Sequence, residues 1–234
     1  MIILPYGDSA LLINFEQIVD ESVNQQVIAL HNQLKDWTEV TFTIPAYCSL
    51  TVGFDKSQTD LTTLREKITG VQLDLTETEK TKRIVSIPVS YGGELGPDLE
   101  DVSSLTGLSL EEIIAQHTGQ PYRVFMLGFV AGFPYLGKLP EVIQCPRRET
   151  PRKEVPEGSV GLAGFQTGIY PTTAPGGWQL IGRTPVKCFD PGKDNPSLLQ
   201  PGDWVQFRAI NEVEYETIAD SVRMGNYKPE VSHG

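Results

Sequence analysis

Apolar and polar positions along the first 75 residues alternate between the two-residue period of strands and the spacing of amphipathic helices. Apolar residues at helical spacing predict helices near 21–36 and 59–69, the second ending at Gly70. The segments predicted as strands are Ser9–Phe15, Val40–Ile44, Cys48–Phe54 and Val71–Leu75. The resulting order, β-α-β-β-α-β, is that of the split βαβ unit. We therefore predict a ferredoxin-like α/β domain over residues 1–78.

The pattern changes after residue 75. The polar, charged segment 76–82 (TETEKTK) favours a linker, and Arg83–Ser90 is a predicted strand. Two short helices are expected next, the second opening at Ser109 with a capping box, because Glu112 follows three residues later. Thus the second domain is predicted to begin with a strand and a pair of helices.

From residue 122 onward, short apolar segments are joined by turns rich in glycine and proline, which predicts a closed or nearly closed β-barrel. Trp204–Ile210 and Glu214–Ile218 are predicted to form a final hairpin over Asn211. The barrel domain is therefore expected over residues 79–220, with a loose tail over 221–234. The fold class predicted for the whole chain is α+β.

Turn-forming residues are concentrated in the run Tyr122–Asp203. Of the 22 glycines and 17 prolines in the chain, 12 of each lie between residues 121 and 202. Such a density forces tight reversals and close backbone approaches at a high cost in conformational entropy. We interpret this run as a rigid, loop-rich surface that holds a ligand or a partner.

Charge is unevenly distributed along the chain, whose net charge is −11. Residues 121–190 contain eight basic and five acidic residues, a net charge of +3, so that the rest carries −14. An acidic protein is a poor candidate for nucleic-acid binding, which needs a basic footprint. The basic segment suits a small anionic ligand or an acidic partner surface, and a solvated basic face is the alternative.

Several other classes are disfavoured by the sequence. No apolar run approaches 18 residues, so no membrane span is expected, and the N-terminus lacks the basic region of a secretory signal. The three widely spaced cysteines are typical of a reduced, cytoplasmic protein. The three histidines are isolated, so no metal site is expected, and no phosphate loop for ATP is found in this chain.

Candidate binding residues gather in the basic, turn-rich segment. The Pro175-Gly176-Gly177-Trp178 turn could form an anion-binding nest beside an indole, or a tight hairpin in which Trp178 fills the barrel. Arginine side chains could hold a carboxylate or phosphate, while glutamine and tyrosine could add polar contacts. These residues are Arg147, Arg152, Gln166, Tyr170 and Arg183. As alternatives, the arginines lie at the surface in weak salt bridges, and Gln166 and Tyr170 form hydrogen bonds with buried backbone groups.

A second set of residues could line a hydrophobic groove. It contains Phe129, Phe133 and Tyr135, whose simpler role is to pack a core, and His117. His117 ends a predicted helix, where a C-terminal cap is its alternative role. No catalytic residue can be assigned from the sequence.

Ordered motifs make the chain similar to the allophanate hydrolase subunit 1/sporulation-kinase inhibitor family. They cover residues 5 to about 210, and one departure is Ala131, where the family usually has proline. The motifs are Gly7-Asp8-Ser9-Ala10, Pro45-Ala46-Tyr47, Gly96-Pro97-Asp98-Leu99, His117, GFVAGFPYLG, PRRETPR, GSVGLAG, Gln166, Tyr170-Pro171, PGGW, Gly182-Arg183-Thr184 and Pro201-Gly202-Asp203.

This resemblance implies a cyclophilin-like fold for the predicted barrel and a function that depends on partners. Members act with a homologous C component and a third, A component to open 5-oxoproline to glutamate at the expense of ATP. Two alternatives also follow from the resemblance. One is an inhibitor that binds a histidine kinase through the groove, and the other is a carboxyltransferase half-site in a biotin-dependent urea or allophanate system.

Overall fold

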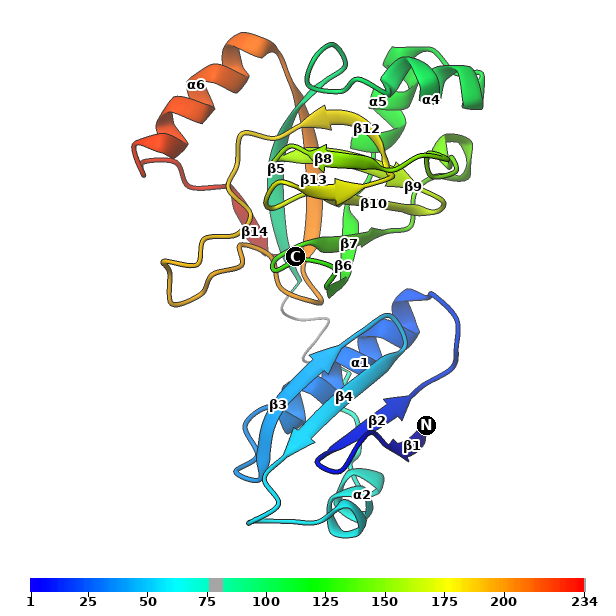
Figure 1. Cartoon of the computed structure of the whole chain (residues 1–234), viewed down its shortest axis with the longest axis vertical. Helices are drawn as coiled ribbons and strands as arrows, with labels where there is room; N and C mark the ends of the chain where they lie inside the picture. The colour runs from blue at the N-terminus through cyan, green and yellow to red at the C-terminus, as the bar shows by residue number, and fades with distance from the viewer. Residues whose placement is uncertain (76–81, 234) are drawn as a thin grey trace. The chain divides into compact units, whose positions relative to one another are not determined.

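The computed structural model describes residues 1–75 and 82–233, and the chain divides into two compact units, Met1–Lys82 and Arg83–Gly234 (Figure 1). Residues 76–81 of the predicted linker lie outside the described residues. In the described part, no helix is both long and apolar enough to cross a membrane. The α+β class predicted from the sequence is confirmed.

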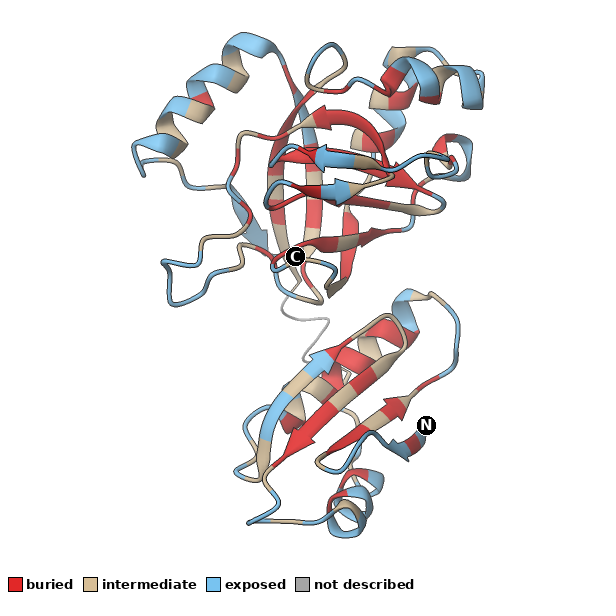
Figure 2. Cartoon of the chain, viewed as in Figure 1, coloured by how far each residue is buried: buried red, intermediate tan, exposed pale blue. Residues whose placement is uncertain are grey.

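The first unit is a four-stranded antiparallel sheet in the order β1-β2-β4-β3, with two helices. Each helix begins at an aspartate whose side chain accepts from backbone N–H groups of the first turn, Asp20 for the first helix and Asp60 for the second. The apolar faces of both helices meet the inward side chains of the sheet in one core (Figure 2). The elements are β1 (Ile2–Pro5), β2 (Ala10–Asn14), α1 (Glu21–Leu34), β3 (Val40–Pro45), β4 (Ser49–Phe54) and α2 (Leu61–Thr69).

The predicted closing strand over Val71–Leu75 is wrong. Val71 and Leu73 pack against the core without joining a strand ladder, and β1 occupies the edge beside β2 instead. The order is therefore β-β-α-β-β-α. The segment Ile2–Pro5 takes this place because Ile3, paired with Ile13, turns its side chain into the core.

The second unit is a closed barrel. Seven strands follow one another in the order β12-β9-β10-β7-β6-β13-β5, and pairing of β12 with β5 closes the ring, while β14 adds to the outside of β5. Only β5 and β13 pair in parallel among these ladders; the other described pairs are antiparallel. The strands are β5 (Arg83–Tyr91), β6 (Tyr122–Leu127), β7 (Pro134–Gly137), β9 (Ser159–Ala163), β10 (Gln166–Ile169), β12 (Gln179–Arg183), β13 (Trp204–Ile210) and β14 (Val231–His233).

Helices lie on different sides of this barrel (Figure 1). The second of the pair α4 and α5 has the predicted capping box at Ser109 and Glu112. A short 3-10 helix follows β7. The helical elements are α4 (Leu99–Thr106), α5 (Leu110–Thr118), η1 (Glu141–Ile143) and α6 (Glu212–Arg223).

The predicted final hairpin is wrong, because Glu214–Ile218 lies within α6. The Asn211 side chain accepts from the backbone N–H of Glu214, so this residue is a helix N-cap and not a hairpin turn. The segment expected to be a loose tail also differs, since Val231–His233 forms a strand paired with β5.

Candidate functional site

A two-stranded ribbon packs against the outside of the barrel and carries several of the predicted site residues. It pairs β8 (Arg152–Val155) with β11 (Ala174–Gly176), with Gly176 opposite Arg152. Its inward side chains and those of neighbouring strands form a second core within this unit. That core contains Phe133, Val155, Ala163, Tyr170, Ala174, Trp178 and Leu180.

Phe133 is the centre of an aromatic cluster in this core. Its ring lies edge-on to Tyr135, Tyr170 and Trp178, with centroid distances of 5.0, 5.1 and 5.4 Å. Phe129 contacts it from outside, at 5.7 Å. Edge-to-face packing places the positive edge of one ring on the negative face of the next, so the cluster holds its rings in fixed orientations.

Two glycines give these rings their positions. A Cβ at Gly168 would lie 3.0 Å from both the Phe133 and Trp178 rings, and 2.8 Å from the Pro134 carbonyl oxygen. A Cβ at Gly176 would lie 2.2 Å from the Tyr170 hydroxyl oxygen. The aromatic residues therefore rest directly on backbone, as only glycine at these positions allows.

A buried carboxylate fixes two arginines next to the aromatic cluster. Asp98, 1% exposed at the start of α4, accepts from Arg148 Nη1 at 2.8 Å and from Arg152 Nη2 at 2.5 Å. Its second oxygen accepts from the Leu180 backbone N–H at 2.7 Å. Arg148 Nη1 also lies 3.5 Å from Asp101 Oδ2, so the charges of the two guanidinium groups are balanced by two carboxylates.

Arg147 has a different environment, among aromatic rings. Its guanidinium lies over the Trp178 ring, 5.9 Å from the centroid, and its side chain is exposed. Burial raises the pKa of Tyr170 to about 12. The hydrogen bond from the backbone N–H of Trp178 and the positive charges of Arg147 and Arg152 lower this pKa and so oppose the shift. For Tyr135 too, burial raises the pKa and Arg147 opposes the shift. Arg147 is thus close to both phenols.

We call this group the arginine–aromatic cluster. Its chemistry is that of a cationic surface with rigid aromatic walls, and it offers donors for a carboxylate or phosphate. Arg152 Nη1 and Arg148 Nε are buried and make no hydrogen bond within the described part of the chain. The cluster consists of Asp98, Phe133, Tyr135, Arg147, Arg148, Arg152, Tyr170 and Trp178.

Other predicted site residues lie outside the cluster or have a different backbone conformation from the one predicted. Arg183, at the end of β12, donates to the Tyr215 hydroxyl of α6 and is not part of the cluster. Gln166 begins β10, on the same face as Gly168. Pro175 and Gly176 lie in strand β11, which is extended backbone rather than the alternating conformation of an anion nest. Trp178 packs outside the barrel in the ribbon core, so it does not fill the barrel.

The predicted groove is not formed by the four residues assigned to it. His117 is 0% exposed inside the barrel, where its Nδ1 lies 2.8 Å from the Tyr91 hydroxyl and its Nε2 lies 2.9 Å from Thr167 Oγ1. Phe133 is 1% exposed. Phe129 is exposed at the tip of the loop after β6, with a φ of 66°, a conformation that a non-glycine residue rarely adopts.

Sequence reasoning does not find Asp98 and Arg148 as parts of this site. In the sequence, Arg148 is only one of several charges in the basic segment. Asp98 belongs to the Gly96-Pro97-Asp98-Leu99 motif, so a signal is present, but its partners lie 50, 54 and 82 residues further along the chain. Only the fold brings them together.

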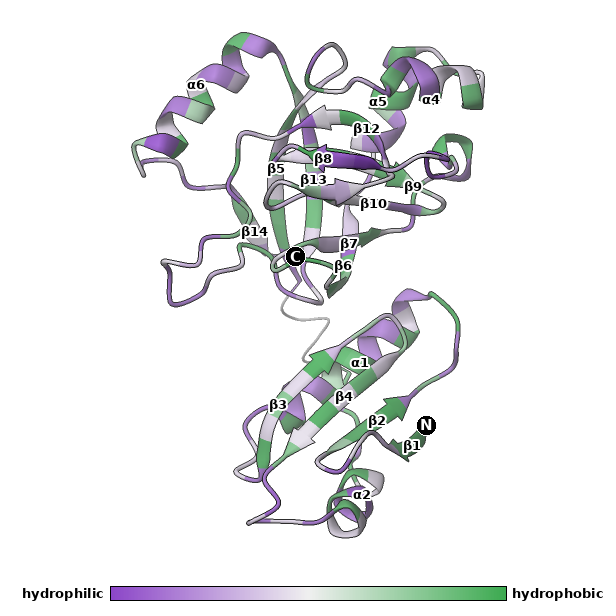
Figure 3. Cartoon of the chain, viewed as in Figure 1, coloured by the Kyte–Doolittle hydropathy of each residue, from purple (hydrophilic) through white to green (hydrophobic). Residues whose placement is uncertain are grey.

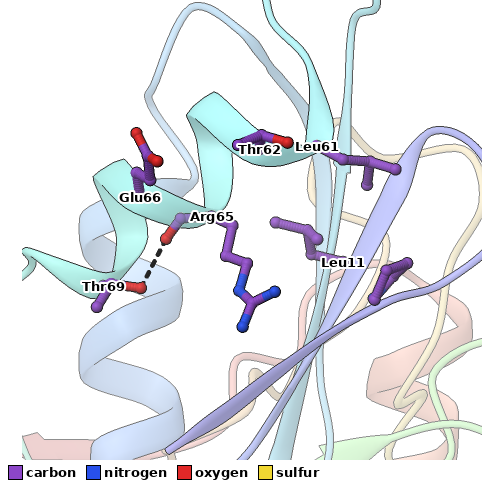
Figure 4. A pocket seen from close by; sticks show the side chains of 7 residues that line it. Leu11, Leu61, Thr62, Arg65, Glu66 and Thr69 are labelled. Carbon is purple, nitrogen blue, oxygen red and sulfur yellow. Dashed lines mark hydrogen bonds between the residues drawn. The ribbon is translucent and has the colours of Figure 1, made fainter.

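A cleft of about 510 Å³ in the first unit is separate from these residues. It opens between α2 and the strands β1 and β2, and the Arg65 side chain extends beside it (Figure 4). None of the site residues predicted from the sequence lines it. Within residues 1–75 and 82–233, no group of three or more His, Cys, Asp or Glu side chains could hold a metal ion.

Comparison with known proteins gives a consistent assignment. Residues 1–199 match the family model "Carboxyltransferase domain, subdomain C and D". The 5-oxoprolinase B subunit of Bacillus subtilis is 43% identical over 222 residues, covering 89% of this chain and 92% of the relative.

Solved structures share the fold. The crystal structure of TTHA0988 superposes with a TM-score of 0.78 at 36% identity, covering 86% of this chain but only 40% of that longer chain. The Pyrococcus horikoshii protein PH0987 is 43% identical, with a TM-score of 0.56 and coverage of 92% of this chain and 100% of that one. The chain therefore belongs to the carboxyltransferase subdomain C and D family and, within it, to the family of 5-oxoprolinase B subunits.

Proposed function

We propose that this chain is the B component of an ATP-dependent 5-oxoprolinase, which hydrolyses 5-oxo-L-proline to L-glutamate together with the A and C components. The observation that carries the proposal is the 43% identity to a 5-oxoprolinase B subunit over 92% of that protein's length. ATP would supply the free energy needed to open an unreactive lactam. The chain is expected to be inactive alone.

Within that complex, we assign the arginine–aromatic cluster to binding an anionic group, the substrate carboxylate or a phosphate. Three features support this role. Arg147 is exposed and, among the described residues, has rings rather than a carboxylate within ion-pair distance. Arg152 Nη1 is a buried donor that has no partner in the described chain. Asp98 and Asp101 balance Arg148 and Arg152, so the net positive charge offered to an anion is that of Arg147.

Position and rigidity decide what each arginine could contribute. Arg148 and Arg152 are held by Asp98, so they would orient an anion without losing much conformational entropy on binding. Arg147 can leave the Trp178 face and contact the ligand directly. The Trp178 indole, 5% exposed beneath Arg147, would then form an apolar wall beside the anion.

The alternatives have less support in the geometry. A kinase inhibitor that docks through a groove would need the four predicted groove residues at the surface, and His117 and Phe133 are buried. A carboxyltransferase half-site is consistent with the family model's name, but the relative matched over nearly its whole length is a component of 5-oxoprolinase.

Reconstitution tests this proposal. The purified chain is mixed with the A and C components, ATP and 5-oxoproline, and glutamate is measured; we expect turnover only when all three proteins are present. Arg147→Ala should lower kcat/KM by roughly 10–100-fold, the range expected for loss of one charge-assisted hydrogen bond.

Arg208→Ala is the matched control, since Arg208 is a half-exposed arginine paired with Glu214 and away from the cluster. It should leave turnover unchanged. Absence of glutamate with three soluble, assembled proteins would refute the function. Full activity of Arg147→Ala would instead refute only the assignment of the site.

A further inference from the structure

Within residues 1–75, neither helix of the first unit covers the second face of its sheet, and we propose that this face binds the same face of a second copy of the chain. Both helices pack on the opposite side, where the inward side chains of the strands form the core. Ten residues point outward, and we call their surface the open face. They are Ile2, Leu4, Ala10, Leu12, Asn14, Phe42, Ile44, Ser49, Thr51 and Gly53.

The strand register arranges these residues in rows that cross the sheet. Leu4 pairs with Leu12, Leu12 with Thr51, and Thr51 with Ile44, so one row spans all four strands. Large apolar side chains stand at its two ends on the edge strands. The row is therefore a continuous ridge with branched aliphatic groups along most of its length.

Exposure of these side chains departs from the usual pattern. In an antiparallel sheet with one covered face, apolar and polar residues alternate along each strand, and the polar residues point to the solvated face. Here Ile2 is 64% exposed, Leu4 46%, Phe42 48% and Ile44 54%. Figure 3 shows the apolar character of β1, β2 and β4 in this unit. A contiguous apolar patch of this kind marks an interaction surface.

None of the ten outward residues carries a charge, whereas residues 1–82 contain twelve acidic and six basic residues. Copies of a unit with a net charge of −6 repel one another through most of their surface. The open face is where two copies can meet without placing like charges opposite each other. Charge depletion at the centre of a contact is also the compositional mark of protein interfaces.

The size of the open face suits a dimer. About 100 Å² is exposed on each of four large apolar side chains and less on the partly buried residues between them, so the face offers roughly 500 Å² per copy. Two copies would bury about 1,000 Å², close to the smallest area expected of a specific interface. Such sheets pack face to face about 10 Å apart, and self-pairing about a two-fold axis is the commonest form of oligomer. The product is a four-layer helix–sheet–sheet–helix arrangement.

The contact between Gly53 and Phe42 keeps the open face smooth. A Cβ at Gly53 would lie 2.1 Å from the Phe42 ring, so the ring lies flat across the glycine. An aromatic residue lying along the sheet, rather than standing on it, leaves a low surface that a second sheet can approach.

Sedimentation equilibrium of the intact chain tests the proposal. We expect a dimer whose dissociation constant increases more than tenfold in Ile44→Asp and in Leu4→Asp, because each substitution buries an unpaired carboxylate in the apolar contact. Val213→Asp is the control, since Val213 is 78% exposed on α6 in the other unit, and it should leave the dimer unchanged.

Salt provides a second measurement. Raising the ionic strength should tighten the dimer by screening the repulsion of two acidic units, whereas a contact made by ion pairs would weaken. A wild-type chain that stays monomeric at about 100 μM, well above the micromolar dissociation constants of weak but specific contacts, overturns the proposal, even if a different protein then covers the face. So does an Ile44→Asp variant, folded by circular dichroism, that is as dimeric as the wild type. Neither readout requires substrate, so this result is independent of the proposed activity.

Discussion

Asp98 ties together three distant parts of the chain. Burying a carboxylate costs several kcal/mol unless its charge and lone pairs are satisfied. Two guanidinium groups and the Leu180 N–H satisfy those of Asp98. The same contacts fix the first turn of α4, the loop before β8 and the start of β12. The positions of the two arginines therefore depend on one acid that itself would not touch a ligand.

His117 makes stability depend on pH. Burial lowers its pKa from 6.5 to about 3. Between pH 6.5 and about pH 3, His117 is therefore protonated in the unfolded chain and neutral in the folded chain. Its contribution is fully present above pH 6.5 and is lost as the pH falls toward 3, by roughly 1.4 kcal/mol per pH unit. Urea unfolding of the wild type between about pH 7 and pH 4 should show this loss.

The variant His117→Gln removes the titrating group and should flatten the pH dependence over the same range. His31, whose pKa is also lowered mainly by burial, titrates in both proteins and cancels in the comparison. Equal slopes for the two proteins would show that folding does not lower the pKa of His117.

At the scale of elements, the ribbon β8–β11 depends on glycine. Gly176→Ala would drive a methyl group into the Tyr170 hydroxyl, only 2.2 Å from the ideal Cβ position. We expect a loss of about 1–3 kcal/mol in unfolding free energy, as for overpacked sites, together with a change in Trp178 fluorescence.

Gly177→Ala is the matched control on the neighbouring residue. Its added Cβ would lie 3.5 Å from Pro151, an ordinary contact. It should change stability by less than about 0.5 kcal/mol. If both variants lose stability equally, the cause is glycine's backbone freedom and not the close approach of Tyr170.

Element types are predictable from sequence where a local pattern is strong. Both helices of the first unit and the capping box at Ser109 are confirmed, and so is the closed barrel. Pairing is not predictable in this way. Val71–Leu75 is apolar enough for a strand, but β1 competes for the same edge, and Asn211 suits a turn as well as the helix cap that it forms. Edge competition is a tertiary effect with no local signal.

The sequence predicts which residues belong to the candidate site better than it predicts how they are arranged in space. Arg147, Arg152, Tyr170 and Trp178 do lie together, as their common segment suggests. Arg183, equally close in sequence, lies at the far end of β12 because strand direction carries it away. Strand geometry, and not sequence distance, decides which residues meet.

For the whole molecule, the two units have separate hydrophobic cores, so we expect each unit to unfold independently of the other. Leu50 is fully buried in the core of the first unit. Leu50→Ala should lower the stability of that unit by about 2–5 kcal/mol. Hydrogen exchange should then show faster exchange in residues 1–75 and unchanged protection in the barrel.

Leu162→Ala, fully buried in the barrel core, is the reciprocal variant. It should spare the first unit. Loss of protection throughout the chain in either variant would mean that the two units unfold together.

Because β5 and β13 pair in parallel but lie far apart in sequence, they are synthesised at different times. Arg83 and its partner Asp203 are 120 residues apart, so β5 leaves the ribosome long before the strand that completes it. At ~5–20 residues per second, the edge of β5 that pairs with β13 waits about 6–24 seconds for its partner. The first unit can fold during that time. Until β13 is made, the incomplete barrel therefore exposes an unpaired strand edge, the kind of surface through which partly folded chains aggregate.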